Sequence, residues 1–519
     1  MRQKENNLII LLKQLWGHFK RTRKLQYLLV LILMLFTAFA EIFSLGALLP
    51  FLTVLTDPET LFNMKEMKPI LNLFGVKAPE DMLLPLTITF GAAALFAGIM
   101  RLVQAWANIR VSFATGADIS IGVYRRTLYQ PYSVHVSRNS SSIINAVSTK
   151  TSAVVFNGIV PVINMISASV ILLSVITTLI IINPIVATSA FIGFGMTYLT
   201  ITLVLRSRLK ENGELIAIES NHMIKSLQEG LGGIRDVLID GSQELYSNEY
   251  KRAVFPLYRA HGINQFIGLS PRFGIEAIGM ILIASLAYWL VEQPGGFTKA
   301  VPLLGTLAFG AQRMLPVLQQ LYLSWSRLQG NEASIKDVLE LLNQPLPENN
   351  LLKKKPFSFK RKIEIEDLHF RYTPDSPKVL DEISLIINKG KKVGFIGETG
   401  SGKTTLLDIV MGLLSPSQGR LMVDGVIIEE QTMRSWQDKI AHVPQTIFLT
   451  DSSIEENIAF GIPSINIDKK RVRWAAEMAQ IGGIIKSWKD GYKTLVGERG
   501  VRLSGGQRQR IGIARALYK

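Results

Sequence analysis

Six long apolar stretches constrain what this chain of 519 residues can fold into. Each has at least the roughly 20 residues that an α-helix needs to cross the hydrocarbon core of a bilayer. The stretches are residues 25–48, 83–107, 159–182, 185–204, 266–291 and 300–323. The first two thirds of the chain therefore predict a helical membrane domain with six spans.

The charge pattern orients this domain. The segment before the first stretch contains one acidic residue, Glu5, and seven basic residues: Arg2, Lys4, Lys13, Lys20, Arg21, Arg23 and Lys24. Cytoplasmic loops beside membrane spans carry excess Lys and Arg, so we expect a cytoplasmic N-terminus. The first apolar run is too long for a cleaved signal peptide, and no small-residue cleavage site follows it.

The net charge of +16 has two interpretations, a nucleic-acid partner or a membrane surface. The bases flank the apolar stretches, which favours the membrane and no nucleic acid. The chain has no cysteine, which excludes disulfides and zinc sites with Cys ligands.

The connections between the stretches differ in length. Residues 108–158 and 205–265 are long and charged, which predicts helices that continue past the bilayer as stalks, with short turns near residues 131–137 and 230–238. Residues 183–184 (NP) predict a tight external turn. Residues 61–74 have apolar residues at roughly helical spacing and predict either an amphipathic surface helix or a loop packed on the protein.

Five charged residues lie within or beside the apolar stretches: Glu41, Arg101, Arg272, Glu276 and Arg313. Charge in hydrocarbon is costly, so such residues face a cavity or a partner. One interpretation is a polar cavity whose arginines attract an anionic head group. The other is pairing, as between Arg272 and Glu276 at i,i+4, or snorkelling from a span end, which suits Arg101.

The pattern changes after the last apolar stretch. Residues 343–359 are polar, contain Pro345 and Pro347, and predict a linker between a membrane domain (1–342) and a second domain (360–519). Residues 363–365 (IEI) then alternate as a strand does.

The second domain contains a phosphate-binding loop pattern, G-x-x-x-x-G-K-[ST]. It comprises Gly397, Glu398, Thr399, Gly400, Ser401, Gly402, Lys403, Thr404 and Thr405. The flanking residues predict a strand over 393–396 and a helix over 404–414. The glycines let backbone N–H groups converge on phosphate, the helix N-terminus adds its dipole, Lys403 adds a charge, and Thr404 offers a hydroxyl to Mg²⁺.

Two further segments follow. Residues 441–445 (AHVPQ) open a loop that contains Gln445. A second run, LSGGQRQR, precedes a predicted helix over 511–517 and contains Leu503, Ser504, Gly505, Gly506 and Gln507. Serine and glycines at a helix start suit an anion, so this run predicts a second phosphate half-site.

These motifs in this order resemble the ATP-binding cassette of ABC transporters, and six spans followed by a cassette resemble an exporter half-transporter, which works as a dimer. The resemblance implies ATP and Mg²⁺ as cofactors, with Thr404 and Gln445 near the metal and Tyr372 stacked on adenine. It implies that residues 503–507 serve the partner's nucleotide, and that residues 497–500 (GERG) contact the cytoplasmic loops.

Within the exporters, the membrane half resembles PglK-type flippases of lipid-linked oligosaccharides. The shared cues are residues 46–51 (GALLPF), the segment 61–74 and residues 313–316 (RMLP). This resemblance implies a multi-pass protein of the bacterial inner membrane with a cytoplasmic cassette, and a pyrophosphate-bearing glycolipid as cargo near Arg272, Arg313 and Glu41. Another lipid, a peptide or a hydrophobic compound is the alternative cargo.

The sequence departs from the family at its C-terminus. The family's Walker B aspartate, catalytic glutamate and switch histidine would follow Lys519, and all six histidines precede Leu503. We therefore expect an incomplete cassette with an exposed sheet edge. ATP turnover is expected of an intact parent transporter, and the alternative is a membrane protein that binds ATP without hydrolysing it.

Overall fold

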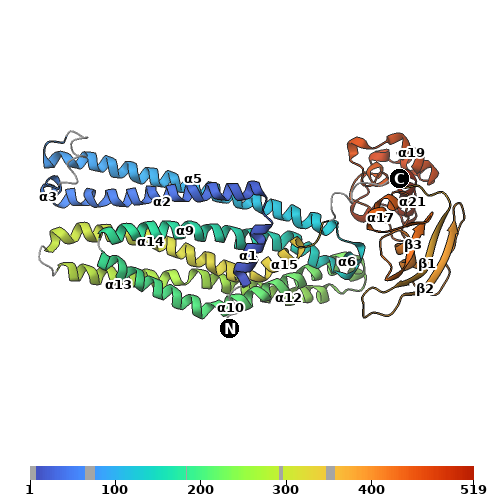
Figure 1. Cartoon of the computed structure of the whole chain (residues 1–519), viewed down its shortest axis with the longest axis horizontal. Helices are drawn as coiled ribbons and strands as arrows, with labels where there is room; N and C mark the ends of the chain where they lie inside the picture. Colours follow the sequence, from blue (N-terminus) through green and yellow to red (C-terminus); the bar gives the residue numbers. More distant parts are fainter. Residues whose placement is uncertain (1–6, 65–75, 183, 292–295, 347–356) are drawn as a thin grey trace. The chain divides into compact units, whose positions relative to one another are not determined.

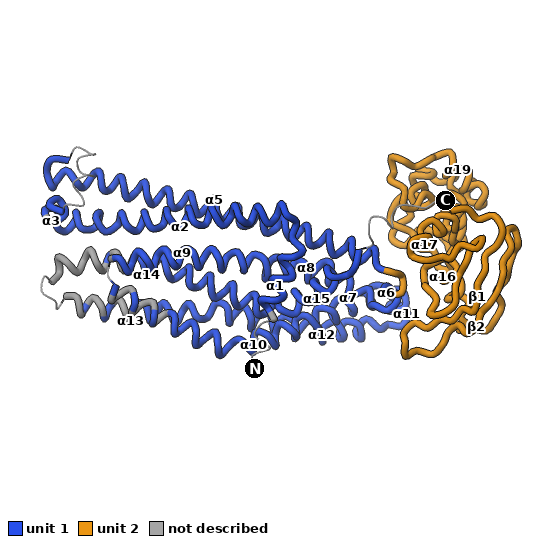
Figure 2. The backbone as a smooth tube through the Cα atoms, viewed as in Figure 1, with its two compact units in different colours: residues 1–130, 134–346 blue, residues 131–133, 347–519 orange. Residues whose placement is uncertain are grey.

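The structure, a computed structural model, describes residues 7–64, 76–182, 184–291, 296–346 and 357–519. The chain divides into two compact units (Figure 2). One comprises residues 1–130 and 134–346, and the other residues 131–133 and 347–519. The described residues of the first unit are helical, whereas the second unit contains a β-sheet.

The helices before residue 347 follow one another closely in the chain, and η2 and η3 are π-helical turns. They are α1 (Asn7–Gly17), α2 (Arg21–Thr56), α3 (Pro58–Phe62), η1 (Pro79–Met82), α5 (Leu83–Leu128), α6 (Tyr132–Ser137), α7 (Ser140–Asn145), η2 (Ala146–Lys150), α8 (Thr151–Val154), η3 (Val155–Ile159), α9 (Val160–Ile182), α10 (Pro184–Gly232), α11 (Ile234–Ile239), α12 (Gln243–Leu269), α13 (Pro271–Val291), α14 (Gly296–Gln329) and α15 (Glu332–Leu342).

All six predicted spans lie in helices, one of them interrupted at Ser270. Three helical segments of the described chain are long and apolar enough to cross a membrane, and they contain the first three predicted spans: Arg21–Thr56, Pro79–Leu128 and Ser140–Ile181. The other three predicted spans lie in α10, in α12 with α13, and in α14, so a total of six stays a prediction. Helices α2 and α5 lie side by side (Figure 1).

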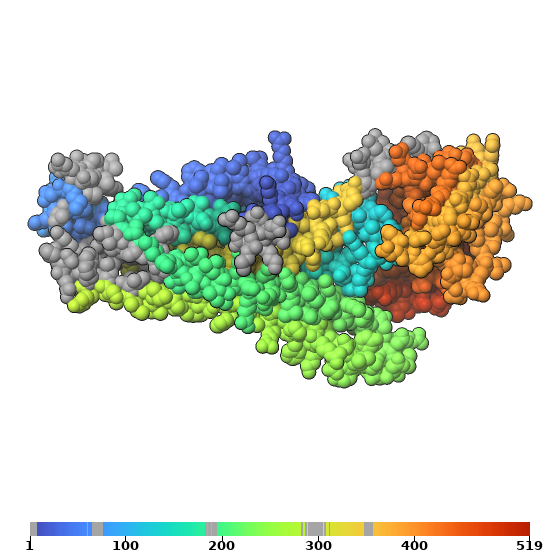
Figure 3. Space-filling model, turned by 60° about the horizontal axis from the view of Figure 1, so that its bottom comes forward, coloured from blue at the N-terminus to red at the C-terminus, as the bar shows by residue number. Residues whose placement is uncertain are grey.

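The stalks are confirmed as helices that continue beyond the spans, because α5 runs on to Leu128 and α10 to Gly232. The prediction of simple turns at their tips is wrong, since α6 and α11 form short helices there. One predicted span is also broken at Ser270, where α12 ends and α13 begins with Pro271, which has no N–H to continue the ladder. Figure 3 shows the side chains of α10 and α12, in green, along one face of this unit.

Two other sequence expectations fall partly outside the described residues. Of the segment 61–74, helix α3 includes only the first two residues, and residues 65–75 are not described. Of the turn at residues 183–184, Pro184 begins α10 and Asn183 is not described.

An apolar core of the first unit lies where α15 packs against the stalk helices. There Ile335 and Leu339 are buried against Val123 of α5 and Val154 of α8. Farther along, α2 exposes many large apolar side chains, such as Phe36 and Phe39. Apolar faces of this extent suit hydrocarbon surroundings rather than water.

The second unit has a four-stranded antiparallel sheet in the order β2-β1-β3-β4. Its elements are β1 (Lys362–Phe370), β2 (Leu380–Asn388), α16 (Lys403–Val410), β3 (Gln418–Val423), β4 (Val426–Ile427), α17 (Glu430–Gln437), α18 (Ile454–Ile458), η5 (Ser464–Asn466), α19 (Lys469–Met478), α20 (Gly482–Ser487), η6 (Gly491–Lys493), η7 (Glu498–Gly500) and α21 (Gly505–Tyr518). Residues 363–365 lie in β1, as the alternating pattern predicts.

This unit has two apolar clusters. One joins the sheet to α16 and α17 through Ile365, Ile409 and Trp436. The other joins α18, α19, α20 and α21, with Ile458 and Ile511 fully buried.

Three local predictions for this unit need correction. Residues 393–396 form no strand, because no described segment completes their backbone hydrogen bonds; Ile396 is fully exposed. The helix predicted over 404–414 ends at Val410, since Gly412 adopts a left-handed φ of 68°. The helix predicted over 511–517 instead begins at Gly505, because Ser504 caps it.

Candidate functional site

The phosphate-binding loop turns sharply into α16. Gly400 and Gly402 have φ values of 87° and 86°, which glycine adopts without steric cost. A Cβ on Gly402 would also lie only 2.8 Å from Leu380 Cδ2 and 2.9 Å from the Val379 carbonyl oxygen. Glycine is therefore required where the loop meets the N-terminus of α16, and the loop backbone can approach a phosphate closely.

Lys403 lies inside this loop. Its ammonium donates to the carbonyl oxygens of Gly397, at 2.8 Å, and Glu398, at 2.6 Å, and lies 3.3 Å from Ser401 Oγ. The next residue, Thr404, exposes its side chain at the helix start. A cation, a hydroxyl and a free helix N-terminus together fit the phosphates of a nucleotide and their metal ion.

Tyr372 lies beside the loop. Its hydroxyl is 3.1 Å from Thr405 Oγ1 of α16, and its ring makes an edge contact with Phe370 of β1. The Tyr372 side chain is nevertheless 47% exposed, so the ring has a surface on which a base can stack. The structure thus brings together Tyr372 and the loop, which lie about thirty positions apart in the sequence.

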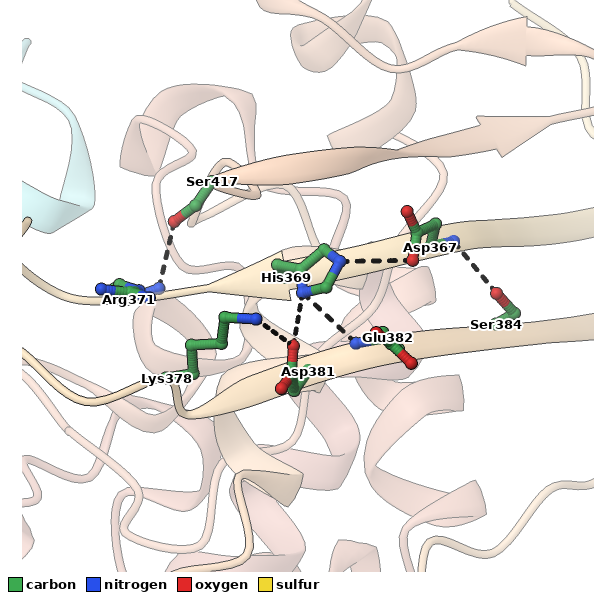
Figure 4. Close-up of polar contacts among 8 residues, drawn as sticks. All are labelled: Asp367, His369, Arg371, Lys378, Asp381, Glu382, Ser384 and Ser417. Atoms are coloured by element: carbon green, nitrogen blue, oxygen red, sulfur yellow. Dashed lines mark hydrogen bonds and ion pairs between the residues drawn. The ribbon is translucent and has the colours of Figure 1, made fainter.

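A polar network holds the segment that carries Tyr372 (Figure 4). His369 of β1 lies between two carboxylates, 2.6 Å from Asp381 and 3.2 Å from Asp367. The hydrogen bonds from Lys378 and then His369 hold the pKa of Asp381 below its ordinary value. Because Asp381 belongs to β2, the network ties the ends of β1 and β2 together just before Tyr372.

The second predicted half-site forms the start of α21. Ser504 Oγ accepts from the Gln507 N–H at 3.2 Å, and Gln507 Oε1 accepts from the Ser504 N–H at 2.8 Å. This reciprocal pair is a capping box, and the two residues that follow Ser504, Gly505 and Gly506, are exposed. Leu503 is buried and anchors the turn.

The segment 497–500 is fixed to this half-site. Arg508 of α21 donates to the carbonyl oxygens of Leu503, at 2.9 Å, and Gly500, at 3.4 Å. A Cβ on Gly500 would meet Leu449 at 2.6 Å, so the segment packs closely on the loop that follows Gln445. Gln445 is exposed, two residues before the buried Ile447 of the helical cluster.

A cluster of ionisable residues lies among the helices of the first unit. Glu41 of α2 is only 1% exposed and lies 2.8 Å from Arg101 Nε of α5 and 3.7 Å from Arg313 Nη1 of α14. The Arg313 guanidinium also lies 5.2 Å from the centroid of the Phe309 ring. The cluster lines a cavity of about 400 Å³ that also contacts Gln312.

The three residues predicted to line one cavity, Arg272, Arg313 and Glu41, therefore do not all lie together. Arg272 pairs instead with Glu276 at 2.7 Å, the i,i+4 contact that its spacing predicts, and both side chains are exposed. Arg101 takes the place of Arg272 beside Glu41, because α5 packs on α2. For Arg101, near a span end, the sequence favours pairing or snorkelling over a free cavity cation, and the ion pair with Glu41 agrees with pairing.

Two family models match the chain. The model for the ABC transporter transmembrane region matches residues 25–293, and the ABC transporter model matches residues 380–519. The chain belongs to the ABC transporter family. This transporter therefore combines a membrane region with an ATP-binding P-loop domain, which agrees with the motifs and helices described above.

Its relatives match different shares of the transporter. It is 28% identical over 538 residues to the heterocyst differentiation ATP-binding protein HepA of Nostoc, covering 99% of this chain and 83% of that protein. It is 32% identical over 298 residues to the ATP-dependent lipid A-core flippase of Chromohalobacter salexigens, covering 56% of this chain and half of that protein. A solved bacterial Atm1-family ABC exporter with ATP bound matches with a TM-score of 0.74 at 20% identity, covering 96% of this chain and 84% of that one.

The transporter also has a polar centre that the motifs did not reveal. Asn457 is fully buried, and its amide donates to the Thr450 carbonyl oxygen at 3.0 Å and accepts from the Thr450 N–H at 3.0 Å. Arg515 of α21 donates to the Asn457 carbonyl oxygen at 2.9 Å and to that of Phe448 at 3.0 Å. This pair joins α18, α21 and the loop after Gln445. A lone Asn and a helical Arg carry no sequence signal of such a role.

Proposed function

We propose that this transporter is one half of a dimeric exporter that moves a lipid-linked saccharide across the bacterial inner membrane, driven by ATP. The observation that carries the proposal is the cluster of Glu41, Arg101 and Arg313. It places two guanidinium groups and one carboxylate at a cavity among apolar helices, with one net positive charge.

The charge of this cluster selects an anion. Arg presents a planar fork of donors that matches phosphate oxygens, and a charge is strongly felt where water is scarce. Glu41 lies within ion-pair distance of both guanidinium groups, and Phe309 adds a cation–π contact to Arg313. Ile171 and Val175 line the same cavity, so an apolar chain has a wall beside the phosphate.

A saccharide needs neutral donors and acceptors, and a second cavity offers them. This cavity has a volume of about 570 Å³ and lies among the stalk portions of the first unit. Its polar lining includes Asn157, Asn264, Gln265, Ser326 and Ser334. Amides and hydroxyls suit sugar hydroxyls, which supports a glycolipid over a purely apolar cargo.

The cassette supplies the energy in this proposal. Lys403 and the loop hold the ATP phosphates, Thr404 and Gln445 lie near Mg²⁺, and Tyr372 stacks on the adenine. Residues 503–507 close on the nucleotide of a second copy, with the cassettes on the cytoplasmic side. The lipid A-core flippases among the relatives support lipid cargo, while a peptide or another hydrophobic compound is the alternative.

A flipping assay in proteoliposomes tests the cargo. Fluorescent polyprenyl pyrophosphate saccharide, the same saccharide on an uncharged lipid, and a hydrophobic peptide are compared with and without ATP. We expect ATP-dependent movement of the first lipid alone, lowered about tenfold or more in Arg313→Ala, as loss of a charge-assisted contact implies. Arg252→Ala, which replaces an exposed arginine of α12, is the control. Equal ATP-dependent movement of the peptide would contradict the assignment of a lipid-linked saccharide as the cargo.

The non-hydrolytic alternative has a separate test. It holds that residues 1–519 bind ATP without turning it over. Steady phosphate release that Lys403→Ala abolishes would contradict it, whereas stoichiometric ATP binding without release would support it.

A further inference from the structure

A groove lies on the first unit between α1, α2 and α9. Its volume is about 490 Å³, within the roughly 300–1,000 Å³ of small-molecule sites. Of the fourteen described residues that line it, thirteen are aliphatic or aromatic and the other is Lys24. The groove therefore combines a long apolar wall with one cation.

Aromatic rings gather beside Lys24. Trp16 lies 5.3 Å from Phe19 and 5.6 Å from Tyr27, measured between ring centroids, and the Lys24 ammonium lies 5.9 Å from the Trp16 ring. The Tyr27 hydroxyl already donates to Thr115 at 2.9 Å, so its ring can serve as apolar wall. Aromatic rings with a polar edge and a lysine are the residues that favour a membrane interface.

The charges near the groove are not equivalent. Lys20 and Arg23 both lie 2.8 Å from Asp118, so a carboxylate balances them. In the described part of the chain, no carboxylate lies within ion-pair distance of Lys24. Lys24 is therefore the cation that an incoming anion would meet at this groove.

The groove also opens toward the apolar surface of α2. Leu28 and Leu31 line it and are 52% and 40% exposed. An acyl chain could enter from the bilayer without crossing water. A peptide would leave its backbone groups without hydrogen-bond partners on such a wall, which is unfavourable.

We propose that this groove binds one acyl chain of an anionic phospholipid, with the lipid phosphate on Lys24. Each CH₂ group that the groove buries adds to the affinity, and this apolar contact is the same for any head group. Lys24 supplies the selectivity, because a lysine near the membrane surface favours an anionic lipid by about fivefold. This site is separate from the cluster of Glu41, Arg101 and Arg313.

Trp16 makes the groove observable. Bromine atoms on an acyl chain quench tryptophan fluorescence on contact, and subtracting the signal of Trp16→Phe isolates Trp16 from the other tryptophans. The full chain is reconstituted in vesicles of phosphatidylcholine and phosphatidylglycerol, with bromine on one lipid or on the other at equal mole fractions. We expect brominated phosphatidylglycerol to quench Trp16 about fivefold more effectively.

Two variants test the groove. Lys24→Gln should bring the two lipids to equal quenching, while Lys13→Gln, an exposed lysine of α1 outside the groove, should keep the preference. Leu31→Phe, which fills the groove from an exposed position, should lower quenching by both lipids. Equal quenching in the unchanged protein, or a preference that survives Lys24→Gln, would overturn the proposal, as would no quenching of Trp16 by either lipid.

Discussion

The hydroxyl of Tyr372 lies 3.1 Å from the hydroxyl of Thr405, which joins the end of β1 to the phosphate-loop helix. This hydrogen bond holds the Tyr372 ring beside the loop while much of the ring remains exposed. In the proposed nucleotide site, this single hydrogen bond would fix the spacing between the base contact and the phosphate contacts.

Substituting Tyr372 should separate stacking from this bridge. Tyr372→Ala should weaken the binding of a fluorescent ATP analogue by about tenfold, because base stacking on an aromatic ring contributes about 1–3 kcal/mol. Tyr372→Phe keeps the ring and should change the Kd by less than about threefold, since it loses one neutral hydrogen bond. Equal losses in the two variants would show that the hydroxyl, not the ring, holds the nucleotide.

Lys403→Ala should lower ATP affinity by about 10- to 100-fold, because it removes a charged donor worth about 1.5–3 kcal/mol. The measurement is a titration of the detergent-solubilised chain with a fluorescent ATP analogue. Lys392→Ala is the matched control, an exposed lysine eleven residues earlier. A Kd within twofold of the unchanged protein in Lys403→Ala would contradict the assignment of the loop.

Ser504 has both a structural and a proposed ligand role, which two substitutions separate. Ser504→Ala should lower the thermal midpoint, because losing an N-cap costs about 1 kcal/mol. Ser504→Asp keeps the cap but places a carboxylate where the partner's phosphate would lie. We expect it to retain stability and lose ATP-dependent cross-linking between copies. Cross-linking as strong as in the unchanged protein would count against this role.

Asn457→Ala should destabilise the cassette by about 2–4 kcal/mol, since it removes a fully buried amide and leaves the Thr450 N–H and carbonyl without these hydrogen bonds. Chemical unfolding followed by tryptophan fluorescence measures the loss. Asn248→Ala, on the surface of α12, is the control. A loss below about 0.5 kcal/mol would mean that water replaces the Asn457 amide.

Acid should weaken the start of β1. The backbone N–H groups of Lys360, Lys362 and Arg361 donate to Asp424 and hold its pKa below the ordinary 3.8. A lowered folded pKa gives stability that is complete above the ordinary value and is lost as pH falls through the folded one.

Asp424→Asn, which tolerates the positive φ of this turn, cannot titrate. Thermal midpoints measured between pH 6 and about pH 3 should therefore fall more steeply in the unchanged protein than in Asp424→Asn. Parallel curves would exclude Asp424 as a source of the acid sensitivity.

The sequence predicts long helices well because apolar length and helical continuity are local properties. It predicts the phosphate loop for a similar reason, since Gly400, Gly402 and Lys403 act within one turn of chain. It fails at residues 393–396, where apolar, β-branched residues predict a strand but a strand exists only when a neighbouring segment completes its hydrogen bonds. It also misses the pairing of Asn457 and Arg515, which lie 58 positions apart.

Sequence alone determined the membrane and cassette character of this protein, because apolar runs, the P-loop and LSGGQ each carry their chemistry in consecutive residues. Only tertiary structure decided which charges meet. From the sequence, Glu41 could pair with any of three arginines. Because α2 packs against α5 and α14, Glu41 pairs with Arg101 and Arg313, whereas Arg272 pairs with Glu276 on its own helix. The same holds for Tyr372 and Thr405, since a contact across 33 positions depends on how β1 meets α16.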